Sequence, residues 1–134
     1  MNVFAPLRSH SIAGPVDEVD LAAFLAIGRF DLSTEAAAQT AIHAHLVGEY
    51  GAGRVQREFR LSKTDRPDFL VDGRIVVEVK VKGARKMDAY KQLERYAKHE
   101  RVTHLILATS QSMNLPSIIG GKPARLLSLG RAWL

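Results

Sequence analysis

Cysteine is absent from this chain of 134 residues, which excludes a disulfide framework and any zinc site built on thiolates. Long apolar runs are also missing, and none approaches the roughly 20 residues that a membrane-spanning helix needs. The apolar stretch 21–27 follows Asp17, Glu18 and Asp20, whose charge is wrong for a secretory signal. We therefore expect a soluble, cytoplasmic protein. Apolar residues make up 46% of the chain, enough for the core of one ordinary domain.

Basic side chains are scarce in the first part of the sequence. Residues 1–53 carry two of them against six acidic ones, whereas residues 54–101 carry fourteen against eight. Residues 102–134 add three basic side chains and no acidic one, which brings the net charge to +5. A polyanion such as nucleic acid would therefore be attracted to the chain from Arg54 onward.

Periodicity and turn residues divide the chain into an N-terminal extension, 1–32, that packs on the core, and a domain, 33–134. The extension contains a short apolar helical stretch, 19–30. In the domain the pattern predicts a helix, three strands, a helix, a strand and a further strand, which is an α/β order. The expected ranges are 33–50, 55–61, 67–71, 74–82, 85–99, 103–110 and 124–129, with a loop at 111–123.

The third expected strand carries two charged residues on one face. Strand alternation places Glu78 and Lys80 together, with Val79 on the opposite face. Asp72-Gly73 predicts a two-residue hairpin, which would set Asp68 nearly opposite Glu78. Facing carboxylates repel each other unless a cation lies between them, and oxygen ligands favour Mg²⁺ or Mn²⁺. A lysine beside such an ion would help to activate water for phosphodiester hydrolysis.

Pro67-Asp68, nine intervening residues and then Glu78-Val79-Lys80 resemble the signature of the PD-(D/E)xK nuclease superfamily. The resemblance implies a restriction-endonuclease-like core, an α-β-β-β-α-β mixed sheet flanked by helices. It also implies an Mg²⁺-dependent nuclease acting on DNA, with Mn²⁺ as a substitute for Mg²⁺. Asp68 and Glu78 would bind the metal with the backbone carbonyl of Val79, and Lys80 would be the catalytic lysine.

Many members of this superfamily carry a glutamate on the first core helix that points into the site. Glu35 lies on the same helical stripe as Ile42 and Leu46, so we expect it to be a further metal ligand or a supporting acid. It is preferred to Glu49, which lies beside the glycines that end the helix. A first-turn position that suits the helix dipole also explains Glu35, and the two roles are compatible.

A second pair lies on the helix after the third strand. Gln92 and Tyr96 are four residues apart and project together, which resembles the Q-x-x-x-Y motif of the RecB-like branch of the superfamily. That resemblance implies that the pair helps to position the DNA backbone, although Tyr96 could equally fill the core. Lys82, Arg85 and Lys86 are expected to neutralise phosphates nearby.

Three alternatives stay open at this point. A Holliday-junction resolvase would share the same core, and a catalytically inactive nucleic-acid-binding or assembly module would share the fold. An unrelated α/β binding protein would carry the motif by coincidence. The domain is small for gripping a duplex alone, so a homodimer or a partner protein that delivers the substrate would supply further surface. A short nuclease of this type would fit a phage-like setting.

Overall fold

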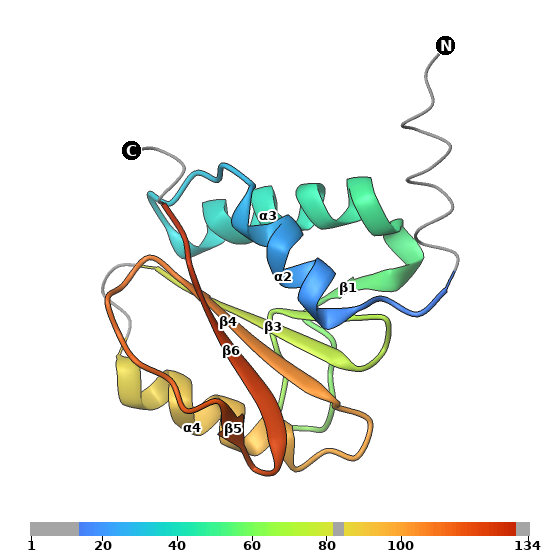
Figure 1. The fold of residues 1–134 in the computed structure, drawn as a ribbon, viewed down its shortest axis with the longest axis vertical. Helices are drawn as coiled ribbons and strands as arrows, with labels where there is room; N and C mark the ends of the chain where they lie inside the picture. The colour runs from blue at the N-terminus through green and yellow to red at the C-terminus, as the bar shows by residue number, and fades with distance from the viewer. Residues whose placement is uncertain (1–13, 82–84, 131–134) are drawn as a thin grey trace.

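A computed structural model describes residues 14–81 and 85–130 of the chain. They form a mixed α/β structure in which a six-stranded sheet has the strand order β1-β2-β3-β4-β6-β5. Helices α2 and α3 cover one face of the sheet and α4 covers the other, as Figure 1 shows. The Lys82 position lies outside the described residues.

The elements have the following bounds. The helices are α2 (Glu18–Ala26), α3 (Glu35–Tyr50) and α4 (Lys86–Ala97), with a single 3₁₀ turn, η1 (Ala52–Arg54). The strands are β1 (Val55–Arg57), β2 (Phe69–Val71), β3 (Ile75–Lys80), β4 (His104–Thr109), β5 (Ile118–Ile119) and β6 (Lys122–Ser128). From α3 to β4 the order is helix, three strands, helix and strand, as the sequence predicts.

Helix α3 ends where the sequence predicts and begins two residues after the start of the expected range. The Thr34 hydroxyl accepts a hydrogen bond from the Ala37 N–H at 3.0 Å, which satisfies one of the unpaired donors of the first turn. Gly51 ends the helix with a φ of 90°, a value that a side chain would disfavour. The buried stripe consists of Ala38, Ile42, Leu46 and Tyr50.

The described part of the N-terminal extension packs on the core, as expected. Leu21 and Leu25 of α2 are fully buried in the same hydrophobic cluster as α3. The Asp17 carboxylate caps the helix by accepting from the Val19 and Asp20 N–H groups. Arg125 of β6 donates to both carboxylate oxygens of Glu18, which ties α2 to β6.

The first strand is much shorter than the expected range 55–61. Pairing with β2 ends at Arg57, because Glu58 adopts a φ of 54° and turns the backbone out of the sheet. The alternation of apolar and polar residues in 55–61 therefore predicted a longer strand than the structure contains. Phe59 and Leu61 are half-buried because they pack under α4 as part of a loop. The strand predicted at 67–71 likewise begins only at Phe69.

The hairpin between β2 and β3 is present, but three residues separate its paired ends instead of two. Val71 pairs with Ile75, and Asp72 and Gly73 both have positive φ values, 56° and 70°. The Asp72 carboxylate accepts from the Val16 N–H and lies within ion-pair distance of Arg54 and Arg74. These contacts stabilise a left-handed conformation that aspartate otherwise tolerates only at a cost.

The segment after β4 contains more structure than the expected loop at 111–123. Ile118–Ile119 forms β5, which pairs antiparallel with the first residues of β6. Gly120 and Gly121 make the turn with positive φ values, and a side chain at Gly120 would collide with Ala97. The final predicted strand is confirmed as β6, parallel to β4.

Alternation along β3 decides which side chains meet which helix. Val77 and Val79 belong to the cluster with α2 and α3, whereas Val76 belongs to the cluster with α4. Glu78 and Lys80 therefore face the α4 side of the sheet. No helix in residues 14–81 and 85–130 has both the length and the hydropathy to cross a bilayer.

Candidate metal site between the second and third strands

Asp68 and Glu78 lie directly opposite each other at the open end of the β2–β3 hairpin. The Asp68 N–H donates to Glu78 Oε1 at 3.0 Å, and the Val79 N–H donates to Asp68 Oδ2 at 2.8 Å. These two bonds continue the β2–β3 ladder beyond its last backbone pair, with carboxylates in place of carbonyls. The predicted juxtaposition of the two carboxylates is confirmed, because the register of the hairpin places residue 68 against residue 78.

Lys80 completes the charged group on this face. Its Nζ lies 3.5 Å from Glu78 Oε2, and the two side chains are 15% and 3% exposed. Thr109 of β4 is fully buried and stands opposite Lys80 in the parallel ladder. A carboxylate and an ammonium are therefore held close together in a strand that is otherwise apolar, where leaving either without a partner would be costly.

The two carboxylates have raised pKa values. Burial is the largest cause of the shift at Glu78, whose pKa rises to about 8, and the neighbouring charge of Asp68 adds to it. The pKa of Asp68 rises to about 6, again mainly through burial, while the Val79 N–H and Lys80 oppose the shift. Two such groups share protons near neutral pH in the absence of a cation, so they titrate as one coupled pair.

Helix α3 supplies two polar side chains beside Asp68. Gln39 Nε2 donates to Asp68 Oδ1 at 3.1 Å, and the charge of the half-buried Glu35 raises the pKa of Asp68. Gln39 is not among the site residues that sequence reasoning selects. Its spacing of four residues from Glu35 on one helix face is the signal that could have found it.

Glu58 is a second neighbour of Asp68 that sequence reasoning misses. Its N–H donates to the Asp68 carbonyl at 2.8 Å, and its charge raises the pKa of the Asp68 carboxyl. The position of Glu58 follows from the register of β1 against β2, which places residue 58 opposite residue 68 and is known only from the structure. The left-handed φ of Glu58 comes after this bond and turns the following residues out of the sheet.

Gln92 and Tyr96 lie on the side of α4 that faces the sheet. Tyr96 is 2% exposed, and its pKa is raised by burial first and then by the charges of Glu78 and Asp68. Gln92 Oε1 is buried and has no hydrogen-bond partner among the described residues. A buried carbonyl oxygen without a donor is uncommon, and it lowers the stability of the folded protein.

Replacing Gln92 by methionine is expected to raise the free energy of unfolding by about 0.5–2 kcal/mol, because the unpaired oxygen is removed at similar side-chain length. Urea unfolding measures the change. Gln56→Met is the matched control, since Gln56 is exposed on β1 and its replacement relieves no buried group. A Gln92→Met protein less stable than wild type would show that the oxygen has a partner.

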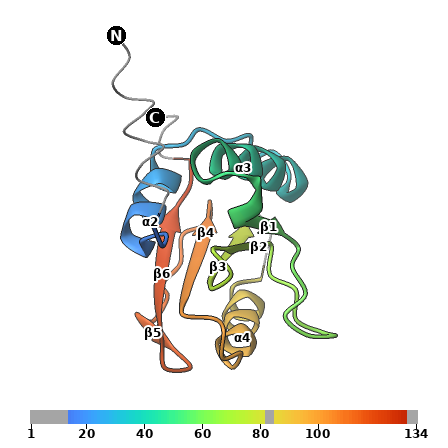
Figure 2. The same cartoon turned by 90° about the vertical axis from the view of Figure 1, so that its right-hand side faces the viewer.

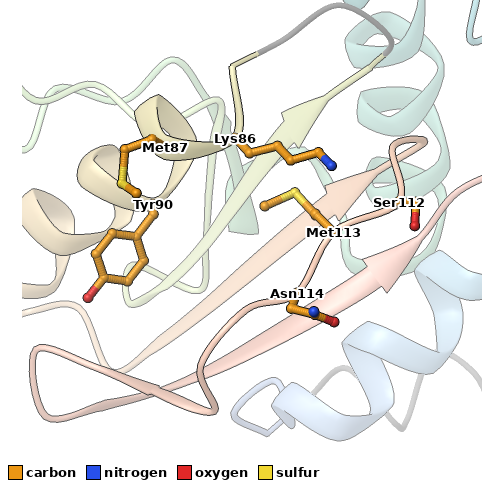
Figure 3. Close-up of a pocket in the computed structure, with 6 residues that line it drawn as sticks. All are labelled: Lys86, Met87, Tyr90, Ser112, Met113 and Asn114. Atoms are coloured by element: carbon orange, nitrogen blue, oxygen red, sulfur yellow. The ribbon is translucent and has the colours of Figure 1, made fainter.

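The predicted phosphate contacts on α4 are exposed. Arg85 occupies the N-cap position of α4 without a side-chain cap bond, and Lys86 begins the helix. Lys86 lines an open cavity of about 620 Å³ between the start of α4 and the segment after β4. Figure 3 shows its side chain extending toward Met113, with Tyr90 farther along the helix. Lys82, predicted to act with them, lies outside the described residues.

The carboxylates present fit a cation held by few protein ligands. Within residues 14–81 and 85–130, no three His, Asp or Glu side chains form a group able to hold a metal ion. Glu35 is thus near Asp68 but does not complete a three-carboxylate site. The Val79 N–H points to Asp68, and in a strand the carbonyl of a residue points to the same edge as its N–H. Mg²⁺ commonly uses one or two carboxylates and several waters, which suits Asp68 and Glu78.

Comparisons of this chain with protein-family models, with curated protein sequences and with solved structures find no match. The geometry of the site and the spacing of its residues are therefore the features that bear on function.

Proposed function

We propose that this protein is a metal-dependent nuclease with a restriction-endonuclease-like core that hydrolyses phosphodiester bonds, in DNA by preference. The observation that carries the proposal is the Asp68–Glu78 pair, interlocked by two hydrogen bonds across β2 and β3, with Lys80 Nζ 3.5 Å from Glu78. A structural role explains this group poorly, since a buried carboxylate beside a half-buried one destabilises a fold that does not use them.

Asp68 and Glu78 would hold the ion, with the Val79 carbonyl beside them. Each Asp68 oxygen already accepts one hydrogen bond, from Gln39 and from Val79, and each carboxylate oxygen has a second lone pair. The existing hydrogen bonds orient the carboxylate without consuming its ligating capacity. This is how hydrogen-bonding neighbours commonly orient metal ligands.

A bound Mg²⁺ would polarise the phosphate and lower the pKa of a coordinated water. Lys80 would accept or hold a proton at Nζ and stabilise charge that develops on the phosphate oxygens. The buried Gln92 Oε1 is an acceptor with no donor in the described structure, so it would accept from a water or from the substrate. Tyr96 would close the inner wall of the site and exclude solvent.

Purified protein is expected to cleave DNA only when Mg²⁺ or Mn²⁺ is present, and excess EDTA should stop the reaction. Plasmid, single-stranded DNA and a four-way junction are the substrates to compare, because preference for the junction would indicate a resolvase. Asp68→Asn removes one ligand charge at nearly constant shape and should abolish cleavage and weaken Mn²⁺ binding in calorimetry.

Two results would contradict this proposal. One is a wild-type protein that cleaves none of these substrates with either metal. The other is an Asp68→Asn protein that cleaves as fast as wild type. Mn²⁺ binding without cleavage would instead favour an inactive module of the same fold.

A further inference from the structure

The segment between β1 and β2 presents a concentration of positive charge next to the candidate site. We call residues 57–66 the basic loop. Arg57, Arg60, Lys63 and Arg66 are all exposed, and no ion pair engages any of them within the described residues. Its two acidic residues are Glu58, beside Asp68, and Asp65. The Asp65 carboxylate is buried and paired, so it does little to neutralise the exposed cations.

The basic loop is held in place by side chains on and after α4. Asp65 contacts His99 Nε2 at 2.8 Å and accepts from Arg95 Nε at 3.1 Å, and the pKa of Asp65 is lowered mainly by its bond to His99. Phe59 packs under the Arg101 guanidinium, whose carbon lies 4.8 Å from the ring centroid. Within the loop, the Leu61 N–H donates to the Asp65 carbonyl at 2.8 Å. Its charges are therefore presented by an ordered backbone.

Both ends of the basic loop meet at Asp68. At the first end, Arg57 pairs with Phe69 and the Glu58 N–H donates to the Asp68 carbonyl. At the other end, Arg66 is two residues before Asp68 in the chain. Figure 2 shows the loop in green, leaving the edge of the sheet and extending beside α4. A chain of phosphates bound along the loop would consequently continue to the carboxylate pair.

We propose that the basic loop binds the sugar–phosphate backbone of the DNA substrate and guides it to Asp68 and Glu78. The inference rests on the proposed nuclease function for the identity of the polyanion. Charge complementarity supports it, because phosphates pair with exposed Arg and Lys and release counterions. Arg95 extends the surface onto α4, since its side chain is 48% exposed while Nε is fixed by Asp65.

The test is DNA binding measured without turnover. Fluorescence anisotropy of a labelled duplex and a labelled single strand is followed over a series of NaCl concentrations, in Lys80→Ala protein and without divalent metal. Lys63→Ala with Arg66→Ala should raise Kd by about tenfold and reduce the slope of log K against log salt by about 1–2. Arg60 is left intact because its Nη1 donates to the Lys63 carbonyl within the loop.

Arg29→Ala is the matched control. Arg29 is exposed between α2 and α3, on the other side of the sheet, so its loss should leave both Kd and slope unchanged. If the loop variant and the control have equal salt slopes, the proposal is overturned. Tighter binding of an RNA of the same sequence would overturn the assignment of the ligand to DNA. Circular dichroism melting confirms that each variant is folded.

The test of the basic loop gives a result that can be told apart from a failure of the nuclease proposal. If the wild-type protein cleaves nothing but the loop variant loses DNA binding, the proposal that the basic loop binds DNA is supported and the nuclease proposal is refuted. If the wild-type protein cleaves DNA and the loop variant has the same KM as wild type, the nuclease proposal is supported and the proposal for the basic loop fails. If both hold, the loop variant should raise KM with little change in kcat.

Discussion

Glu78→Gln is expected to make the protein more stable than wild type at pH 8, by about 0.5–2 kcal/mol, while abolishing metal-dependent stabilisation. Wild type must either hold a proton on Glu78 or bury its charge, because that side chain is 3% exposed beside Asp68. Glutamine has nearly the same shape and can still accept from the Asp68 N–H. It carries no charge that needs to be desolvated.

The dependence on pH follows from the raised pKa. Folding lifts the pKa of Glu78 from an ordinary 4.5 to about 8, so the folded protein binds more protons than the unfolded chain between these values. The free energy of unfolding of wild type should therefore fall as pH rises through that window, by at most about 1.4 kcal/mol per pH unit for each such proton. Asp68, whose pKa rises to about 6, adds to the slope in the lower part of the window.

Urea unfolding of both proteins from pH 4.5 to pH 8 measures this effect, with the window taken from the Glu78 shift. The two curves should approach each other at the acid end and separate as pH increases. Added Mn²⁺ should stabilise wild type at pH 8, by about 2.7 kcal/mol at a hundredfold excess over Kd, and leave Glu78→Gln unchanged. Parallel pH curves for the two proteins would mean that folding does not raise the pKa of Glu78.

Lys80→Ala is expected to lower kcat by about 10²–10⁴-fold, the usual contribution of a positioned acid–base group. Its Nζ is 3.5 Å from Glu78 Oε2 and only partly exposed, so it can act on a phosphate or water held at the same carboxylate. Mn²⁺ affinity should stay the same or increase, because a competing positive charge is removed. Single-turnover cleavage and calorimetry together separate these two effects.

Lys80→Arg distinguishes charge from proton handling. Arginine keeps the positive charge beside Glu78, but it does not lose a proton at accessible pH, and its planar head differs in shape. Low activity in this variant would support a proton-transferring lysine. Wild-type rates would show that positive charge alone is sufficient.

Much of the site could be predicted from local rules. Strand alternation alone places Glu78 and Lys80 on one face, and Asp72-Gly73 indicates a turn whose register brings Asp68 against Glu78. The actual loop is one residue longer than expected. That added residue puts residue 68 directly opposite residue 78. Capping by Thr34 and termination by Gly51 are equally local, so α3 was bounded to within two residues.

Other parts depended on contacts that no local pattern contains. Alternation through 55–61 predicted a strand, yet Glu58 turns out of the sheet and residues 58–66 become a loop fixed by Asp65 to His99 and Arg95. Arg95 and His99 lie about thirty positions from Asp65 in the chain, so no local sequence pattern predicts that they pair with it. The same holds for Gln39, whose bond to Asp68 joins two elements on different layers.

The sequence by itself determined the periodicities, the hairpin and the carboxylate–lysine spacing, because each is set by backbone geometry over a few residues. Only the tertiary structure decided how deeply the Asp68–Glu78 pair is buried, and therefore how far both pKa values rise. It also decided that Glu35 stays outside a three-carboxylate group while Gln39 and Glu58 contact Asp68. Burial and desolvation are properties of packed layers, and they exist only once α3, α4 and the sheet have come together.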